Sequence, residues 1–187
     1  MTAVLEGLQN MAAGSADCAV MWPAIVEGRD GVELQRAFVE LRRVLVQTGT
    51  VWLRLADVEQ GGGWAGVPWR VVLALQAAGW IVRNAVVLQH RVPPVSERRR
   101  LEQAHDLVFL LAKSRTYYFD RDSLREDSKG PGDVWTSASV SRCIEAACPP
   151  GGTVLDPFCR TSATADAARR LGRRFVGITT GETRWAA

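Results

Sequence analysis

The sequence is poor in the residues that build metal centres and disulfide frameworks. It has four cysteines and two histidines among 187 residues, and no two cysteines show the CxxC spacing. A structural zinc site needs several such ligands at short spacings, and a disulfide framework needs many cysteines in a short chain. The pattern therefore predicts no metal site and buried, free thiols. The four cysteines are Cys18, Cys143, Cys148 and Cys159.

Long apolar runs are absent as well. No stretch reaches the roughly 20 apolar residues that cross a bilayer. The first residues, MTAVLEGLQNM, lack the basic region and apolar core of a secretion signal. We therefore expect a cytoplasmic protein without a membrane partner. The net charge of +3 is a mild basic bias, which permits a nucleic-acid partner without requiring one.

Strand and helix patterns alternate along the chain. Short apolar runs typical of buried strands are separated by segments with apolar residues at helical spacing. This alternation predicts an α/β fold with a mostly parallel, twisted sheet and helices on both faces. The expected helices cover residues 32–46, 68–78, 141–148 and 162–171, and the expected strands cover 17–26, 50–55, 80–88, 106–111, 153–155 and 175–178. We expect residues 1–187 to form a single domain in which 120–133, DRDSLREDSKGPGD, is a charged loop or linker.

Residues 153–178, TVLDPFCRTSATADAARRLGRRFVGI, predict one strand–loop–helix–strand unit. The loop of such a unit opens at the carboxyl edge of the sheet, where open α/β folds bind their ligands. Ligand loops there are usually rich in glycine, because only glycine lets backbone N–H groups approach a cofactor closely. The loop at 159–163 reads CRTSA and contains no glycine. The unit thus has the framework of a ligand site without its usual residues.

In chain order, five segments resemble the amino-group DNA methyltransferases, which methylate the exocyclic amine of adenine or cytosine with S-adenosylmethionine. The segments are SADCAVMWPAIVEGRDG, FVELRRVLVQTGTVWLRLAD, GVPWRVVLALQAAGWIVRNAVVLQHRVPP, AHDLVFLLAKSRTYYFD and GGTVLDPFCRTSATADAARRLGRRFVGIT. Their order resembles the class in which the catalytic segment precedes the cofactor loop. The resemblance implies a Rossmann-like methyltransferase fold, somewhat truncated, with residues 120–133 in place of a full target-recognition insert. A shared fold does not by itself imply activity.

The resemblance also marks where catalytic residues are replaced. The family has Ser, Asn or Asp, then Pro-Pro, then an aromatic; the polar residue accepts hydrogen bonds from the target amine, and the ring stacks on a flipped-out base. The vestigial motif positions here are Trp22, Pro23, Ala24 and Ile25. Losing a hydrogen bond worth roughly 1.5–3 kcal/mol and a stacking contact worth roughly 1–3 kcal/mol predicts a rate lower by about two to four decades. Trp22 either replaces the stacking ring or, as we favour, fills the base pocket as core.

The cofactor positions implied by the resemblance are altered separately. The family's LDPF-x-GSGTT loop and the acidic residue that holds the ribose align with Asp156, Phe158, Arg160, Thr161, Ser162 and Thr179. Side chains in place of glycines obstruct close backbone approach, and Arg160 brings positive charge toward a cationic sulfonium centre. Thr179 replaces the carboxylate. We expect Asp156 to end the strand and cap the following helix rather than to hold a ligand.

A basic run after residue 90 is the best remaining candidate for a functional surface. The arginines aligned with the family's DNA-binding face are Arg91, Arg98, Arg99 and Arg100. Phosphate contacts need only charge and reach, so DNA affinity can survive the loss of catalysis. Glu97 and Glu102 interrupt the run, and the alternative is a merely solvated cluster.

Three functions remain open from the sequence. The favoured one is a methyltransferase-like protein without methyl transfer, acting as a DNA-binding or regulatory protein and needing no cofactor. The second is an inactive subunit of an active DNA methyltransferase, and the third is a divergent active enzyme that uses S-adenosylmethionine. The candidate partners are double-stranded DNA, a methyltransferase or other protein, and a second copy of the chain. The segment around Trp64 and Trp69 is either a protein interface or core.

Overall fold

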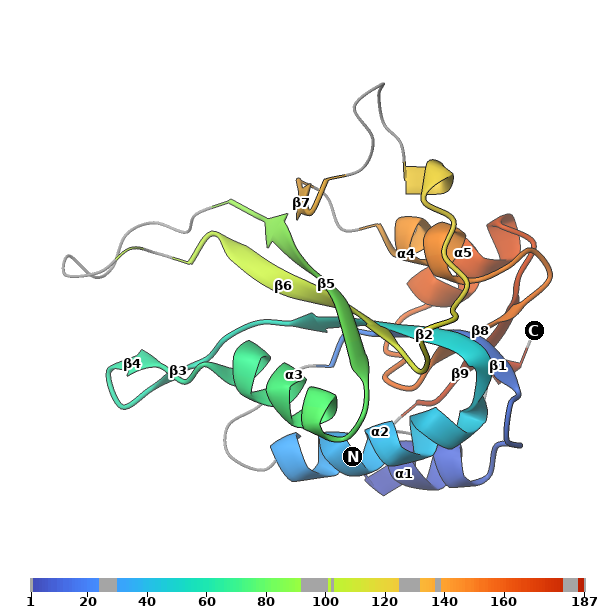
Figure 1. The fold of residues 1–187 in the computed structure, drawn as a ribbon, viewed down its shortest axis with the longest axis horizontal. Coiled ribbons are helices and arrows are strands. Elements are labelled where there is room, and N and C mark those ends of the chain that lie inside the picture. The colour runs from blue at the N-terminus through green and yellow to red at the C-terminus, as the bar shows by residue number, and fades with distance from the viewer. Residues whose placement is uncertain are drawn as a thin grey trace.

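The computed structural model describes residues 2–23, 30–91, 101, 103–124, 132–136, 139–179 and 185–186. Within these ranges an eight-stranded sheet has the order β10-β9-β8-β1-β2-β6-β5-β7, and a small hairpin, β3-β4, stands apart (Figure 1). The strands are β1 Ala16–Met21, β2 Leu45–Leu55, β3 Glu59–Gln60, β4 Gly63–Trp64, β5 Ile81–Gln89, β6 His105–Ala112, β7 Val134–Trp135, β8 Thr153–Asp156, β9 Arg174–Gly177 and β10 Trp185–Ala186.

The large sheet is mostly parallel, as the alternation of strand and helix patterns predicted. β1 pairs in parallel with both β2 and β8, and β8 pairs in parallel with β9. Antiparallel pairing places β6 between β2 and β5 and adds β10 beside β9. The carboxyl ends of β1, β2, β5 and β8 therefore meet at one edge of the sheet, together with the first residues of β6.

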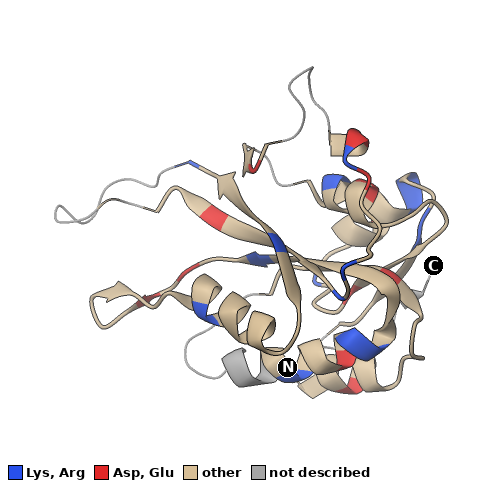
Figure 2. Ribbon diagram, in the orientation of Figure 1, with Lys and Arg blue, Asp and Glu red and all other residues tan. Residues whose placement is uncertain are grey.

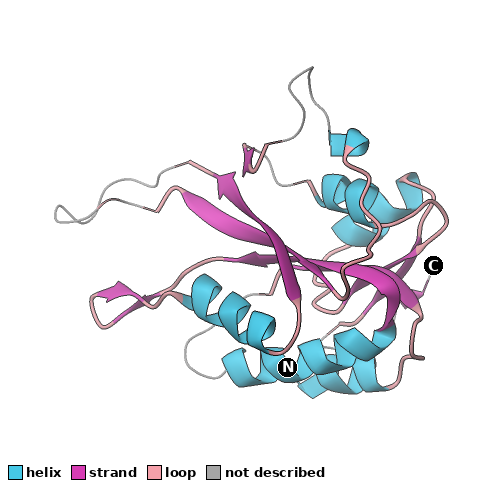
Figure 3. Ribbon diagram, viewed as in Figure 1, coloured by secondary structure: helices cyan, strands magenta, loops and turns pink. Residues whose placement is uncertain are grey.

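Helices cover both faces of the sheet (Figures 1 and 3). They are α1 Thr2–Gln9, α2 Asp30–Val44, α3 Val67–Ala77, α4 Val140–Ala147 and α5 Ala163–Arg170, with a short 3-10 helix, η1, at Asp122–Leu124. The first three lie on one face, and α4 and α5 lie on the other. Figure 2 shows the strands mostly tan, with charged residues concentrated on helices, loops and strand ends.

Side chains that alternate along each strand supply two cores. On β2, Leu53 and Leu55 pack with α1, α2 and α3, whereas Trp52 packs with α4 and α5. On β8, Leu155 and Val154 divide in the same way. Successive residues of a strand point to opposite faces, so runs that are apolar at every position are needed where both faces are covered.

The boundary between α2 and β2 differs from the expected one. The helix expected through residue 46 ends at Val44, because Leu45 already pairs with Ala16 of β1. The Lys113 ammonium donates a hydrogen bond to the Leu45 carbonyl at 2.6 Å. Tertiary contacts that the local pattern does not contain therefore end the helix early.

The N-terminal helix α1 was not expected from the sequence. Its buried residues, Val4 and Leu8, are spaced four apart and pack against the core below the sheet. The Arg43 guanidinium of α2 donates to the carbonyls of Leu8 and Met11, at 2.8 and 2.7 Å. A cation at the carboxyl end of a helix satisfies the last carbonyls and offsets the helix dipole.

The connection from β2 to α3 is ordered around one carboxylate. Asp57 accepts hydrogen bonds from the backbone N–H groups of Val58, Gly66 and Val67, at 2.9, 3.1 and 3.0 Å. These bonds satisfy donors at the start of α3. Within this connection the β3–β4 hairpin turns at Gly61 and Gly62, whose φ values of 61° and 83° favour glycine.

Trp64 and Trp69 are surface residues rather than core. Trp64 lies on β4, not on the helix, and is 46% exposed; Trp69 of α3 is 52% exposed. The Trp69 ring also contacts the ring of Phe109, with centroids 5.8 Å apart. The alternative in which these tryptophans are buried is therefore wrong.

The described residues also show the state of the cysteines, the grouping of metal-ligating side chains and the length of the apolar helices. All four cysteines are buried free thiols, as predicted. No group of three metal-ligating side chains comes together in the described ranges. No helix in those ranges is long and apolar enough to span a bilayer.

Candidate functional site

Trp22 lies at the carboxyl end of β1; the sequence resemblance aligns it with the family's polar catalytic residue. It is half-buried, and its side chain packs against the core on the α4–α5 side of the sheet. Its indole Nε1 is buried without a hydrogen-bond partner among the described residues. Pro23 is also half-buried, and Ala24 and Ile25 lie outside the described residues. Among the described residues of this motif, the only polar side-chain group is the Trp22 indole N–H, which donates a hydrogen bond and cannot accept one.

Arg54 of β2 holds one face of the Trp22 ring. The guanidinium carbon lies 5.1 Å from the ring centroid, within the range of a cation–π contact. The same guanidinium donates from Nε and Nη2 to one oxygen of Asp106, at 2.9 and 2.6 Å. The other oxygen of Asp106 faces His90 Nε2 at 3.7 Å. Four adjacent strands thus contribute one connected cluster, Trp22–Arg54–Asp106–His90, which we call the edge cluster.

The carboxylate of the edge cluster is turned toward basic side chains of the protein itself. The Asp106 carboxylate, whose side chain is 10% exposed, spends one oxygen on Arg54 and turns the other toward His90. Arg54 covers a face of Trp22 on which a base would stack. The partners of Asp106 are Arg54 and His90. Nothing in the local sequence reveals this cross-strand pairing.

Asp156 ends β8 and links the following loop to α5. Its carboxylate accepts a hydrogen bond from the Phe158 backbone N–H at 3.0 Å and from the Thr164 hydroxyl at 2.7 Å. Burial raises the pKa of this carboxyl, and the two hydrogen bonds partly offset the rise. Both oxygens are therefore engaged within the protein. Asp156 thus ends the strand, as expected, and is tied to α5 through the Thr164 side chain rather than by capping a helical N–H group.

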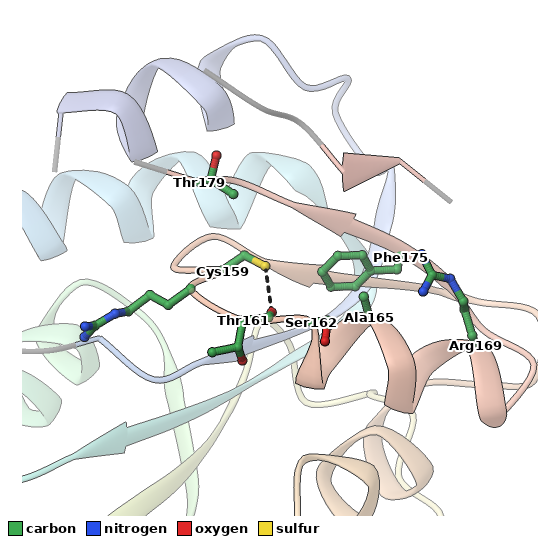
Figure 4. Close-up of a pocket in the computed structure, with 8 residues that line it drawn as sticks. Cys159, Thr161, Ser162, Ala165, Arg169, Phe175 and Thr179 are labelled. Atoms are coloured by element: carbon green, nitrogen blue, oxygen red, sulfur yellow. Dashed lines mark hydrogen bonds between the residues drawn. The ribbon is translucent and has the colours of Figure 1, made fainter. Parts of the chain in front are cut away.

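A hollow of about 300 Å³ lies between the β8–α5 loop, α5 and β9 (Figure 4). Its lining residues are Cys159, Arg160, Thr161, Ser162, Ala165, Arg169, Phe175 and Thr179. The apolar side chains of Cys159, Ala165 and Phe175 are buried and form its floor, and the Cys159 thiol donates to the Thr161 carbonyl at 3.4 Å. We call this space the α5 hollow.

The α5 hollow corrects one expectation from the sequence. Side chains in place of the family's glycines were expected to obstruct this end of the sheet. Arg160, Thr161 and Ser162 are instead exposed residues that line the hollow. Side chains in place of the family's glycines therefore change the chemistry of the lining but do not fill the space. The charge and shape of the lining then decide which ligand the hollow can hold.

The lining does not fit S-adenosylmethionine, the cofactor that the fold implies. That cofactor carries a cationic sulfonium, and the hollow has two arginines, Arg160 and Arg169, of which Arg169 is paired with Asp166, with no carboxylate among its lining residues. Like charges at short range are unfavourable where water is partly excluded. Thr179 can offer only a hydroxyl to the ribose. Phe158 packs with the opposite core and does not line the hollow.

Of the four arginines expected to contact DNA, Arg91 is the one that the structure describes. Arg91 follows β5 and is exposed, whereas Arg98, Arg99 and Arg100 lie outside the described residues. Gln89 pairs with His105, so the connection between β5 and β6 leaves and returns at the edge that carries the edge cluster (Figure 1). The topology therefore brings the ends of the basic connection to the edge where the family performs its chemistry.

A second hollow, which sequence reasoning missed, has a volume of about 450 Å³. It lies against β2, β5 and β7, and its lining includes Trp52, Phe119 and Trp135. The rings of Trp52 and Trp135 are 5.5 Å apart. None of the family-implied site positions lines it.

Comparisons with known proteins agree with this architecture. The family model described as DNA methylase, for N6 and N4 methyltransferases, matches residues 33–133 and 135–186. The chain is 30% identical over 202 residues to the type II methyltransferase M.SmaI of Serratia marcescens, an alignment that covers 80% of this chain and 69% of that protein.

Solved structures show the same fold at lower identity. The cytosine-N4-specific PvuII DNA methyltransferase superposes with a TM-score of 0.80 at 14% identity, covering 92% of this chain and 78% of that one. The M1.HpyAVI complex with S-adenosylmethionine superposes with a TM-score of 0.70 at 16% identity, covering 96% and 88%. These likenesses confirm the predicted Rossmann-like fold.

Proposed function

The chain belongs to the amino-group DNA methyltransferase family, and we propose that it uses this fold as a DNA-binding or regulatory protein without transferring methyl groups. The observation that carries the proposal is the edge cluster. At the position where a relative needs an amine acceptor, this chain has Trp22, and the nearby carboxylate of Asp106 is paired with Arg54. A base placed there would meet donors and a cation instead of an acceptor.

The α5 hollow supports the proposal independently. Solved relatives include a complex with S-adenosylmethionine, but here the lining carries arginine and hydroxyl groups and no carboxylate. A single unfavourable contact could be offset elsewhere in a site. Replacement on both the base side and the cofactor side removes binding and chemistry together, so we propose that no methyl-donor cofactor is used.

Double-stranded DNA is the proposed partner. The relative with PvuII specificity is a DNA methyltransferase, and the basic connection between β5 and β6 starts and ends at the corresponding edge of this sheet. The proposed contacts are Arg91, Arg98, Arg99 and Arg100, which would meet phosphates rather than bases. We further propose a single domain over residues 1–187, with 120–133 as a loop, in a cytoplasmic protein.

A mobility-shift titration with a duplex of about 30 base pairs tests the DNA part. The slope of log affinity against log salt changes by about 0.9 for each phosphate contact. The variant Arg98/Arg99/Arg100→Ala should therefore lose about 2.7 from the slope and weaken binding at every sequence. The matched control, Arg36/Arg70/Arg170→Ala, removes the same charge from exposed helix positions and should bind like the wild type. Equal behaviour of the two variants would remove the case for the basic run.

A methyl-incorporation assay tests the other part. The protein is incubated with duplex DNA and tritiated S-adenosylmethionine, with an active relative as positive control. The proposal predicts no tritium in the DNA above background. Stoichiometric or greater incorporation would contradict it and would identify a divergent enzyme.

An inactive subunit of an active methyltransferase is the second candidate. Exposed apolar side chains on α3 and β4 favour it: Trp64, Trp69 and Leu73 are 46%, 52% and 60% exposed. Large exposed aromatics are enriched at protein interfaces. Trp69→Ala and Leu73→Ala should then reduce co-purification with an active methyltransferase from the same cell. An unchanged yield of complex, or no complex with wild type, would count against this candidate.

A further inference from the structure

The lining of the α5 hollow points to a ligand of opposite charge to the methyl donor. Two arginines, Arg160 and Arg169, stand at its rim, and three hydroxyl residues, Thr161, Ser162 and Thr179, accompany them. Arginine presents several N–H donors in a planar fork that matches phosphate and carboxylate oxygens. The rim is therefore suited to an anion.

The dimensions of the hollow exclude a simple ion as its natural occupant. Its lining runs from Ser162, just before α5, to Arg169 in the last turn, a length of about 10 Å at 1.5 Å per helical residue. The floor between them is apolar, made by Cys159, Ala165 and Phe175 (Figure 4). A volume of about 300 Å³ falls at the lower end of the range for small-molecule sites. An elongated ligand with an apolar, planar body and one anionic end fits this shape.

The floor is rigid enough to select a shape. A Cβ atom added to Gly177 would come within 2.9 Å of the Phe175 ring and 3.1 Å of the Cys159 Cβ. Phe175 itself is 1% exposed. Close packing of this kind leaves little freedom for the ring to move into the hollow.

The anionic end belongs at the start of α5. Ser162 makes no side-chain capping hydrogen bond there, and the Ala163 N–H donates to the Thr161 hydroxyl at 3.4 Å. The N–H groups of the first turn of α5 carry a partial positive charge that favours an anion. Arg160 has no ion pair or hydrogen bond with any residue in the described ranges. The Arg169 guanidinium, at the other end, is already paired with Asp166 at 3.2 Å.

Nearby carboxylates do not cancel this charge. Asp156 lies behind the loop, 8% exposed, with its oxygens bonded to Phe158 and Thr164. Asp166 is engaged by Arg169. Among the described residues, the charge that remains without a partner at the loop is that of Arg160.

We propose that the α5 hollow binds a nucleoside 5′-phosphate, with the base over the Cys159–Ala165–Phe175 floor and the phosphate against Arg160 and the start of α5. A site that held a cationic nucleoside derivative in relatives would then hold an anionic one here. The binding is independent of DNA contact through the β5–β6 connection, which leaves the sheet from β5 rather than from β8.

Calorimetric titration of the full chain with AMP and with adenosine tests the proposal. AMP should bind with a Kd below about 1 mM, and adenosine should bind at least about tenfold more weakly, because it lacks the charged hydrogen bonds. The variant Arg160→Glu should weaken AMP binding by at least about tenfold. Its matched control, Arg170→Glu, makes the same charge change at an exposed residue outside the lining and should stay within about threefold of wild type.

Several outcomes would overturn the proposal. They are AMP binding no tighter than adenosine or inorganic phosphate, equal weakening by the two variants, and displacement of AMP by a short duplex, which would assign the phosphate chemistry to the DNA backbone. A folded Arg160→Glu protein, checked by circular dichroism, excludes a trivial loss. Absence of AMP binding together with absence of methyl transfer would refute the nucleotide site and leave the proposed function standing.

Discussion

The base side and the cofactor side of this protein differ in how they depart from the family. Around Trp22 the edge is closed: ring, guanidinium and carboxylate contact one another across adjacent strands. At the α5 hollow a space of about 300 Å³ is open, and its lining has arginines and hydroxyl groups without a carboxylate. Around Trp22, side chains that could contact a ligand contact one another instead. The α5 hollow keeps room for a ligand.

This difference predicts how reversible each change is. Restoring a polar residue at position 22 would leave Arg54 without its ring contact and Asp106 still paired. Restoring glycine at Arg160 would require no neighbouring residue to repack, because Arg160 is exposed. A substitution on the cofactor side therefore disturbs few neighbouring contacts, whereas a substitution at Trp22 disturbs the contacts of the edge cluster.

The largest expected effect concerns the floor of the hollow. Phe175→Ala should lower the free energy of unfolding by about 3–5 kcal/mol, because it removes a ring that is 1% exposed and leaves a cavity. Val134→Ala, at a position 62% exposed, is the control and should change it by no more than about 0.5 kcal/mol. Urea denaturation measures both. A small effect at Phe175 would mean that the floor is loosely packed and the shape argument fails.

The edge cluster should give a smaller but coupled effect. Asp106→Ala and Arg54→Ala should each cost about 1.5–3 kcal/mol, the worth of hydrogen bonds to charged groups. Because Arg54 is 35% exposed, the values should fall toward the lower end. A double-mutant cycle should give a coupling free energy above about 0.5 kcal/mol. Additive single effects would show that the pair is an ordinary surface contact and that the edge is not closed by it.

The pH dependence of Asp156 should be smaller still. Burial raises the pKa of this carboxyl above its ordinary value of 3.8, so the folded state binds the proton more tightly than the unfolded state. The stabilisation is present below pH 3.8 and is lost as the pH rises through the raised pKa. The free energy of unfolding of Asp156→Asn, relative to wild type, should therefore shift in favour of the variant across that rise. A constant difference between the two proteins would contradict the buried setting of Asp156.

Thiol reactivity should distinguish the hollow from the core without affecting stability. Burial raises the pKa of Cys143 to about 12, so almost no thiolate forms there near neutral pH. Burial and the neighbouring Asp156 also raise the pKa of Cys159, but this thiol is 7% exposed at the hollow. Alkylation followed by mass spectrometry should find Cys159 modified before Cys143 in the native state. The reverse order would show that the hollow is closed in solution.

The mostly parallel sheet and its two covered faces could be predicted because local patterns carry them. Alternate residues of β2, such as Trp52 and Leu53, must both be apolar when helices cover both faces. The helix α1 was missed, since two apolar residues in eight, Val4 and Leu8, are too few to define a period.

The site was predictable only in its replaced motif residues. Trp22, Arg160 and Thr179 stand out against the family pattern because a resemblance supplies the expected residue at each position. The pairing of Arg54 with Asp106 joins residues on different strands, and only the register of β2 and β6 brings them together. Whether substituted side chains fill a space or line it depends on their rotamers, which no sequence pattern specifies.

Calorimetric titration of the wild-type protein with S-adenosylmethionine and its demethylated product tests the central claim most directly. The like charge of Arg160 and the missing carboxylate at Thr179 predict no binding of S-adenosylmethionine tighter than about 1 mM. The missing carboxylate alone predicts the same limit for the demethylated product, which has no sulfonium. A one-to-one complex with a micromolar Kd would contradict the account and would return this chain to the active members of its family.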